Sequence, residues 1–428
     1  MLYMRLRLKR QRKRRKKLRA NWCERIVNDE DTDSDEDTAL ARVVPRIQKL
    51  VRRQLKHHTS YTFSGRPRQV FPLPPMVSPL QELDEYQFIT ATRFTKGQFS
   101  DMLIQLSRLP RTVKTKHRCT CSLELALFIL LKRWTAPQTY EQMTWFFRRQ
   151  RSWLIAVHET ILNLVIEEYC ALITNMDYRR VLRELDDWSS TLMMHGAGTR
   201  DGVFFADGKA KKDCKPGPAG QTARAIALHL GVSADKIQES MYNGYYGFHG
   251  EKVQHIIDAS GMIYAYGTCL RTPDAKVFEE SGMKQQLKFY VNNDITRPVK
   301  TVTDTAYAAD DFTVPTKSKS QIAHIPAALR QAVLKLEAKN RRFRFEVEES
   351  FNKVVTNFPH TDYFRKHKMF QSGDLNFSKL VGMWYAVVLF TNLHTCYNGS
   401  HATGRYGVEP PCAADYVYSC NHDLLPRQ

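Results

Sequence analysis

Three acidic residues in this sequence have the type and the setting for metal-dependent chemistry at phosphorus. Asp207 and Asp304 each follow a short apolar run, and Glu348 lies in a later stretch with helical periodicity. Carboxylates that converge from separate elements hold two hard cations about 4 Å apart, which activate a nucleophile and stabilise the leaving oxygen. Mg²⁺ and Mn²⁺ prefer such oxygen ligands. The sequence therefore predicts a site for two Mg²⁺ or Mn²⁺ ions, with Asp207, Asp304 and Glu348 as catalytic residues and metal ligands.

Strand-like apolar runs are predicted to position two of these acids. The runs lie at 203–206, 253–257, 263–266 and 299–302. A helix with proline at its front is predicted for 273–290, between the third and fourth runs, and further helices follow. This order is typical of an α/β fold built on one mixed sheet. Asp207 is expected to end the first strand and Asp304 the fourth.

A helix predicted over 346–358 offers three glutamates as the third ligand. At about 100° per residue, Glu348 lies roughly 75° from the centre of the apolar face, Glu346 roughly 125° away, and Glu349 nearly opposite. A carboxylate at the rim of a buried face reaches the sheet edge, whereas one that faces solvent does not. The geometry therefore favours Glu348.

Residues 93–190 are predicted to form an all-α domain with the outline of a helix-turn-helix unit. Ser122 and Thr139 are expected N-caps, and a third helix has apolar residues at helical spacing. A basic turn at 148–152 precedes that third helix and favours DNA contact. An ordinary helical bundle would show the same apolar stripes. The arginines that would contact DNA are Arg148, Arg149 and Arg151.

The charge of the chain points to a polyanionic partner. Lys and Arg number 64 and Asp and Glu 44 in 428 residues, which gives a net charge of +20. The nine cysteines are an odd number and do not resemble a disulfide framework, which favours a reducing compartment. No secretory signal is visible, and the longest apolar run, 380–390, is too short to span a bilayer. We therefore expect an intracellular protein without membrane contact, and a buried helix at 380–390.

The two ends of the chain are predicted to be tails. Residues 5–19 hold eleven Lys or Arg, which indicates a disordered arm for nuclear import and phosphate contact, or a solvated tail without a role. Residues 29–37 hold seven acids and form either a spacer or a mask for the basic arm. The predicted organisation has a tail at 1–60, a linker at 61–92, the helical domain at 93–190, an α/β domain at 200–400 and a tail at 401–428.

Motifs in residues 200–395 resemble the DDE transposases of the Harbinger (PIF/Harbinger) family. They occur in the family's order over nearly half of the chain. The matching residues are Ala206-Asp207-Gly208; Tyr242-Asn243-Gly244 with His249, Lys252 and Gln254; Asp258 to Gly261; Asp274; Asp304-Thr305-Ala306-Tyr307; and Arg344, Val347-Glu348, Phe351 and Phe358.

The resemblance implies an RNase H-like fold for 200–400 and metal-dependent cleavage and joining of DNA at transposon ends and a target site. It also implies a separate Myb-like DNA-binding partner protein, and we consider a homo-oligomer as well. The chain departs from the family pattern where Thr303 replaces Gly and Pro273 replaces His. Further departures are Asn352, Val355 and Asn357, which replace Gly, Lys and Arg and thin the positive charge near the third acid.

Two basic clusters flank the acids in the sequence. Each is either a set of phosphate contacts or a solvated surface. The first follows Asp207 and comprises Lys209, Lys211 and Lys212; the second precedes Glu348 and comprises Arg341, Arg342 and Arg344.

Two functional alternatives use the same residues. One is a domesticated DNA- or chromatin-binding protein that does not cleave, and the other is an RNA-processing nuclease. Zinc sites are less favoured, because neither candidate set has CxxC spacing. These sets are His117, Cys119 and Cys121, and Cys412, Cys420 and His422.

Overall fold

A computed structural model describes most of the chain from residue 71 onward. The described residues are 71, 73–197, 200–213, 233–293, 299–362 and 379–418. They all belong to one structural unit, Phe71–Gln428. The predictions for the tail at 1–60, the first part of the linker, Cys420 and His422 lie outside the described residues.

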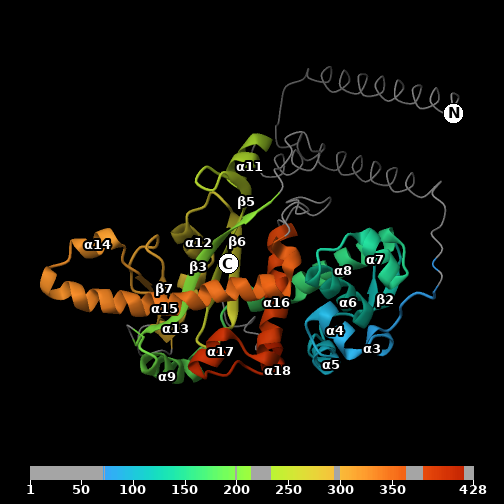
Figure 1. The fold of residues 1–428 in the computed structure, drawn as a ribbon, viewed down its shortest axis with the longest axis horizontal. Coiled ribbons are helices and arrows are strands. Elements are labelled where there is room, and N and C mark those ends of the chain that lie inside the picture. Colours follow the sequence, from blue (N-terminus) through green and yellow to red (C-terminus); the bar gives the residue numbers. More distant parts are fainter. Residues whose placement is uncertain are drawn as a thin grey trace, which may run out of the picture. The chain divides into compact units, whose positions relative to one another are not determined.

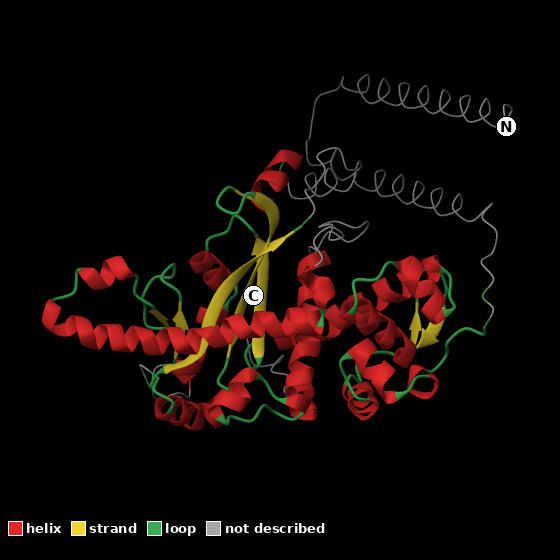
Figure 2. Cartoon of the chain, viewed as in Figure 1, coloured by secondary structure: helices red, strands yellow, loops and turns green. Residues whose placement is uncertain are grey.

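A mixed sheet forms the centre of the α/β part (Figure 2). Its strands run in the order β6-β5-β3-β7-β8, in which β6, β5 and β3 pair antiparallel and β3, β7 and β8 pair parallel. A short strand β4 pairs with the beginning of β5. The four predicted strands and the mixed sheet are confirmed. The bounds are β3 Gly202–Lys212, β4 Tyr242–Asn243, β5 Phe248–Ile257, β6 Ile263–Cys269, β7 Lys300–Thr303 and β8 Thr313–Pro315.

One long helix crosses the sheet. Helix α15, Ala327–Asn357, contacts β3, β5 and β7, and Figure 1 shows it running across the strands. Its buried face carries Phe343, Val347, Phe351 and Val354. This helix includes the predicted segment 346–358 but begins much earlier.

The remaining helices of the α/β part follow the sequence closely, with one break. The predicted helix 273–290 is divided into α12, Asp274–Glu280, and α13, Met283–Asn293. Gly282 separates them with φ of 74°, a left-handed conformation that glycine adopts without strain. The predicted buried helix at 380–390 is confirmed within α16, Lys379–Asn398. Two further helices are α11, Ala234–Met241, and α14, Lys319–Ala323.

The helical part preceding the sheet has a buried helix at its centre. Almost every side chain of α6 is buried, and its N-cap Ser122 accepts a hydrogen bond from the Leu125 amide at 3.2 Å. Thr139 caps α7 with a capping box, so both predicted caps are confirmed. The helices are α3 Pro79–Glu82, α4 Glu85–Thr92, α5 Lys96–Gln105, α6 Leu123–Thr135, α7 Tyr140–Phe147, α8 Arg151–Thr174 and α9 Tyr178–Met194.

Two assignments in these regions need correction. The segment predicted to be all-α contains a hairpin of β1, Thr112–Lys114, and β2, Thr120–Ser122, whose three-residue strands are too short to show a period. The segment predicted as the start of a C-terminal tail forms α17, His401–Tyr406, and α18, Ala413–Tyr418. Both helices bury aromatic residues, so 401–418 is part of the folded unit.

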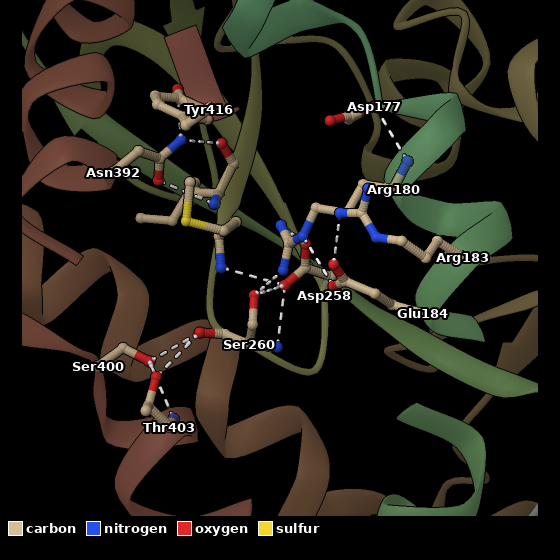
Figure 3. Close-up of polar contacts among 12 residues, drawn as sticks. Asp177, Arg180, Arg183, Glu184, Asp258, Ser260, Asn392, Ser400, Thr403 and Tyr416 are labelled. Carbon is tan, nitrogen blue, oxygen red and sulfur yellow. Dashed lines mark hydrogen bonds and ion pairs between the residues drawn. The ribbon is translucent and has the colours of Figure 1, made fainter. Parts of the chain in front are cut away.

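A buried ion pair fixes α9 against the turn between β5 and β6 (Figure 3). The Arg180 guanidinium lies 3.1 Å from Asp258 and also bonds to Ser260. Asp258 additionally accepts hydrogen bonds from the Ser260 amide and hydroxyl and from the Met262 amide. Burial by itself lowers the pKa of Arg180, but Asp258, Tyr264 and Glu184 together outweigh this effect and the pKa is raised. The turn is thereby held by charge-assisted hydrogen bonds.

The helical part and the sheet share one hydrophobic core. Helix α8 contacts α6 on the helical side and β6 and α16 on the side of the sheet. Gly382 of α16 allows a close approach, because a Cβ atom at this position would lie 2.8 Å from Ile166 Cδ1. Among the described helices, none is long and apolar enough to cross a membrane.

Candidate active site

Asp207 lies beside the point where the parallel part of the sheet ends. The sequence predicted that the first strand ends at Asp207. Strand β3 instead continues to Lys212 in antiparallel pairing with β5. The parallel pairing with β7, however, stops two residues earlier, at Phe205 and Val302. Asp207 therefore stands on a paired strand next to the carboxyl end of β7, where Asp304 follows immediately.

The carboxyl group of Asp207 is largely buried among charged neighbours. Burial raises its pKa to about 6, and the carboxylates of Asp304 and Asp274 contribute in the same direction. The Arg344 guanidinium and a 2.8 Å hydrogen bond from the Gly208 amide oppose the shift. A divalent cation beside Asp207 would offset the same desolvation.

Arg344 joins the other two predicted ligands. Its guanidinium lies 2.9 Å from Asp304 Oδ1 and 3.7 Å from Glu348 Oε1. The Asp304 and Glu348 side chains are 40% and 50% exposed, so solvent and ions reach both. Two of the three predicted ligands therefore pair with one cationic side chain of the protein itself, and the charge of that side chain also acts on Asp207.

The carboxylate oxygens of the three acids suit a hard cation, although the Arg344 guanidinium lies close to them. Asp207, Asp304 and Glu348 provide only carboxylate oxygens, which is the donor chemistry of Mg²⁺ and Mn²⁺ sites. Within the described ranges, no group of three or more His, Cys, Asp or Glu side chains has a metal-binding arrangement. A metal that used all three acids would have to replace Arg344 as their counter-ion.

A fourth carboxylate, Asp274 at the start of α12, adjoins Asp207. Its Oδ1 atom lies 2.9 Å from the Lys252 ammonium, and a Cβ atom on Gly208 would approach that oxygen to 2.5 Å. Only glycine at 208 therefore leaves room for the Asp274 carboxylate beside β3. The sequence motifs contain Gly208, Lys252 and Asp274, but nothing in their spacing indicates this contact.

Two further motif residues close the polar cluster. Gln254 Nε2 donates a 2.7 Å hydrogen bond to the Tyr307 hydroxyl. Burial raises the pKa of that hydroxyl, and the carboxylates of Asp274 and Asp207 raise it further. Tyr307 thus remains a neutral phenol next to the acids.

His255 is the antiparallel partner of Asp207 on β5, so the two side chains lie on the same face of the sheet. Its ring stacks on Phe351 of α15 at 3.8 Å, and its Nε2 accepts a 3.0 Å hydrogen bond from the Trp384 indole. Burial lowers its pKa well below the usual value, and the charges of nearby lysines add to this shift. The ring is therefore neutral, and its Nδ1 atom donates to Ser350 at 2.8 Å.

Glu346 has a structural setting that its helical position did not predict. It is only 1% exposed and lies 2.7 Å from His401 Nδ1 and 2.7 Å from Arg405 Nη1. Helix α17 covers this side of α15 and supplies both partners. The three glutamates were ranked by their angle from the apolar face of the helix. That face does not reveal that a second, polar face also packs against another element, so the ranking underestimated the burial of Glu346.

The side chains of the three lysines that follow Asp207 lie in different environments. The Lys209 ammonium lies over the Phe351 ring at 5.6 Å, and the Lys212 ammonium lies over the Phe248 ring at 5.7 Å. Lys211 is buried and lies 2.9 Å from Asp362. Lys211 is thus engaged within the protein, and phosphate contact by Lys209, Lys211 and Lys212 stays a prediction.

The arginines at the turn between α7 and α8 all have partners within the protein. Arg148 donates a 2.8 Å hydrogen bond to the Pro74 carbonyl, and Arg151 pairs with Glu141 at 2.8 Å. Arg149 lies over the Trp153 ring at 4.7 Å. Their role in DNA binding stays a prediction, and in this structure each of them contacts another part of the chain.

Arg341 and Arg342 line a surface groove of about 660 Å³ on α15. Arg405 and the exposed Phe345 line the same groove. It thus combines three guanidinium groups with an aromatic ring, a combination that suits phosphates and bases. Arg344 does not line it but faces the acids.

All three residues of the first zinc candidate lie within the described ranges, where no metal-binding group of His, Cys, Asp or Glu is found. The Cys119 thiol lies 3.8 Å from the His117 carbonyl oxygen, and burial raises the pKa of Cys121 to about 11. Without a metal ion this thiol is protonated, so zinc binding at Cys121 would have to displace its proton.

Comparison with known proteins identifies no relative. No family model, no curated protein and no solved structure matches this chain. The function must therefore be inferred from the residues and their geometry.

Proposed function

We propose that this protein is a metal-dependent DNA endonuclease and transposase of the DDE type, with Asp207, Asp304 and Glu348 as its catalytic carboxylates. The observation that carries the proposal is the convergence of these acids on Arg344. Its guanidinium contacts Asp304 and Glu348, and its charge acts on Asp207. An acid on β3, an acid just after β7 and an acid on the crossing helix α15 thus lie around one positive charge.

The sheet supports an RNase H-like fold for residues 200–400. Such a sheet has its first strand in the middle, the second and third strands antiparallel on one side, and the fourth and fifth parallel on the other. The order β6-β5-β3-β7-β8 has this connectivity. The comparison is one of topology and not of sequence.

The division of tasks among the residues follows from their contacts. When bound at the three acids, Mg²⁺ or Mn²⁺ would supply activation of water and charge neutralisation at phosphorus. Asp207 must be ionised to serve as a ligand, and its pKa of about 6 allows this at neutral pH. Lys252 holds Asp274 beside Gly208, and Gln254 orients Tyr307. Exposed Arg341 and Arg342 would contact the DNA backbone.

The partners in this proposal follow from charge and from the family resemblance. The net charge of +20 suits double-stranded DNA, and the basic segment 5–19 suits nuclear import. A Myb-like partner protein and a homo-oligomer belong to the same proposal.

Calorimetry of Mn²⁺ and Mg²⁺ binding to the full chain tests the proposal. We expect binding by the wild type and its loss in Asp207→Ala/Asp304→Ala, with and without duplex DNA. The matched control is Glu409→Ala/Asp415→Ala, which removes two exposed acids far along the chain. Equal binding by all three proteins in the presence of DNA would refute the metal site.

A second candidate function is DNA binding without cleavage on the same fold. The ion pairs of Arg344 favour it, because an arginine that neutralises Asp304 and Glu348 makes a metal unnecessary for charge balance. Tight DNA binding without metal binding or cleavage would support this candidate.

A further inference from the structure

Exposed aromatic side chains gather at the turn between β4 and β5. Tyr245 is 90% exposed, Tyr242 is 43% exposed and Tyr246 is 39% exposed. The Tyr245 and Tyr246 rings lie 5.1 Å apart, and the Tyr246 and Phe248 rings lie 5.6 Å apart. Single exposed aromatics are common, but a contiguous set is typical of a binding surface.

Hydrogen bonds to the side chain and the backbone of Asn243 hold this turn in a defined conformation. The Tyr245 amide donates a 2.9 Å hydrogen bond to the Asn243 side chain, and the Gly247 amide donates to the Asn243 carbonyl at 2.9 Å. Gly247 has φ of 68°, which glycine adopts without strain. The aromatic rings are therefore presented on a preorganised turn, which reduces the entropy lost on binding.

The turn is attached to the loop that leads to Asp274. Asn243 Nδ2 donates a 3.3 Å hydrogen bond to the Leu270 carbonyl, four residues before Asp274. The carboxylates of Asp274 and Asp207 also act on Tyr246: burial raises its pKa, and these charges raise it further. The aromatic turn thus adjoins the candidate active site.

Basic side chains flank the aromatic rings. The Lys212 ammonium lies over the Phe248 ring at 5.7 Å. Arg271 forms an ion pair with Glu239, and both line a hollow of about 420 Å³ together with Tyr242, Asn243 and Gly244. Aromatic rings between cations are the arrangement that binds single-stranded nucleic acid, because the rings stack on bases and the cations contact phosphates.

We propose that Tyr245 and Tyr246 form a stacking platform for unpaired bases of DNA next to the strand position that the acids act on. The inference deepens the proposed function and depends on its DNA substrate. It defines the substrate more closely as a duplex that has, or opens to, a single-stranded segment beside the scissile phosphate. Stacking depends little on base identity, so this contact would select structure and not sequence.

The test compares two DNA ligands with the full chain in EDTA, so that cleavage plays no part. One is a blunt duplex and the other has a single-stranded 3′ overhang with 2-aminopurine, whose fluorescence falls on stacking. We expect the wild type to bind the tailed duplex about tenfold more tightly and to quench the probe. Tyr245→Ala/Tyr246→Ala should lose this tenfold preference, about 1.4 kcal/mol, together with the quenching.

Two control proteins separate stacking from loss of structure. Tyr245→Phe/Tyr246→Phe keeps both rings and should keep the preference. Tyr86→Ala removes an aromatic that is 81% exposed on helix α4 and should behave as the wild type. Equal affinity of the wild type for both ligands, or unchanged quenching in the double alanine variant, would overturn the platform. Because no metal is present, this result is independent of the calorimetric test of the acids.

Discussion

Asp207 and Arg344 dominate the electrostatics of the site at the scale of single residues. Asp207 is a buried carboxyl group whose pKa of about 6 lies close to physiological pH. Arg344 supplies a fixed positive charge to acids on three separate elements. Arg344 is a permanent part of the site, whereas a bound metal ion can dissociate when the solution conditions change.

Metal binding should depend on pH through Asp207. A ligand carboxylate must be ionised, so Mn²⁺ affinity should be constant above pH 7 and fall as the pH drops below about 6. Titrations between pH 5 and pH 8 measure this dependence. Affinity that stays level down to pH 5 would contradict the assignment of Asp207 as a ligand.

The same pKa predicts the effect of Asp207→Asn on stability. The folded state holds the Asp207 proton more tightly than the unfolded state, so this group's contribution to stability is lost as the pH rises from about 4 to 6. We therefore expect Asp207→Asn to raise the free energy of unfolding at pH 7 by about 1–3 kcal/mol, with no gain below pH 4. Urea denaturation at both pH values is the measurement.

Replacing Arg344 should strengthen divalent metal binding. In Arg344→Met, Asp304 and Glu348 lose a competing cation, and the ion pairs are partly exposed, so the gain should be roughly 3- to 10-fold, about 1 kcal/mol. Arg344→Lys keeps the charge and should change affinity less. Weaker binding in Arg344→Met would show that the arginine supports the ligands and does not compete for them.

At the scale of elements, the strands and α15 carry the acids, and the turn between β5 and β6 fixes the strands to α9. The Asp258 side chain is completely buried and balances the charge of Arg180 (Figure 3). Removing one partner of such a pair leaves an isolated buried charge, which is more costly than removing both.

Asp258→Ala should therefore lower the free energy of unfolding by about 3–5 kcal/mol. The control is Asp187→Ala, an exposed acid on α9, which should change it by less than about 0.5 kcal/mol. Urea denaturation compares the two variants. Similar small effects in both would mean that Arg180 finds another partner.

At the scale of the whole molecule, the helical part and the sheet depend on each other through α8 and α16. Both helices contribute to one core, and Gly382 of α16 lies against the side chain of Ile166 of α8. A disturbance there should reach both parts, because each loses packing against the same interface.

Gly382→Leu should lower the free energy of unfolding by about 1–3 kcal/mol through overpacking. Hydrogen exchange should then speed up in both α6 and β6. The matched control is Gly404→Leu on α17, where a Cβ atom meets nothing within 4 Å. Faster exchange confined to the helical part would show that the two parts unfold separately.

The sequence by itself determined the elements and the candidate acids, because these depend on local patterns. Apolar runs gave the four main strands, the caps Ser122 and Thr139 gave helix starts, and strand ends drew attention to Asp207 and Asp304. The sequence did not predict short elements such as β1, β2 and α17, because three to six residues show no clear hydrophobic period.

Tertiary structure alone decided which charges meet. The position of Arg344 among the acids, the burial of Glu346 under α17 and the contact of Asp274 with Gly208 join residues far apart in the sequence. A helical period describes how a residue faces its own helix axis, but not which element packs on that face. For this reason the sequence indicated the carboxylates, and only the fold decided their counter-ions and the aromatic turn beside them.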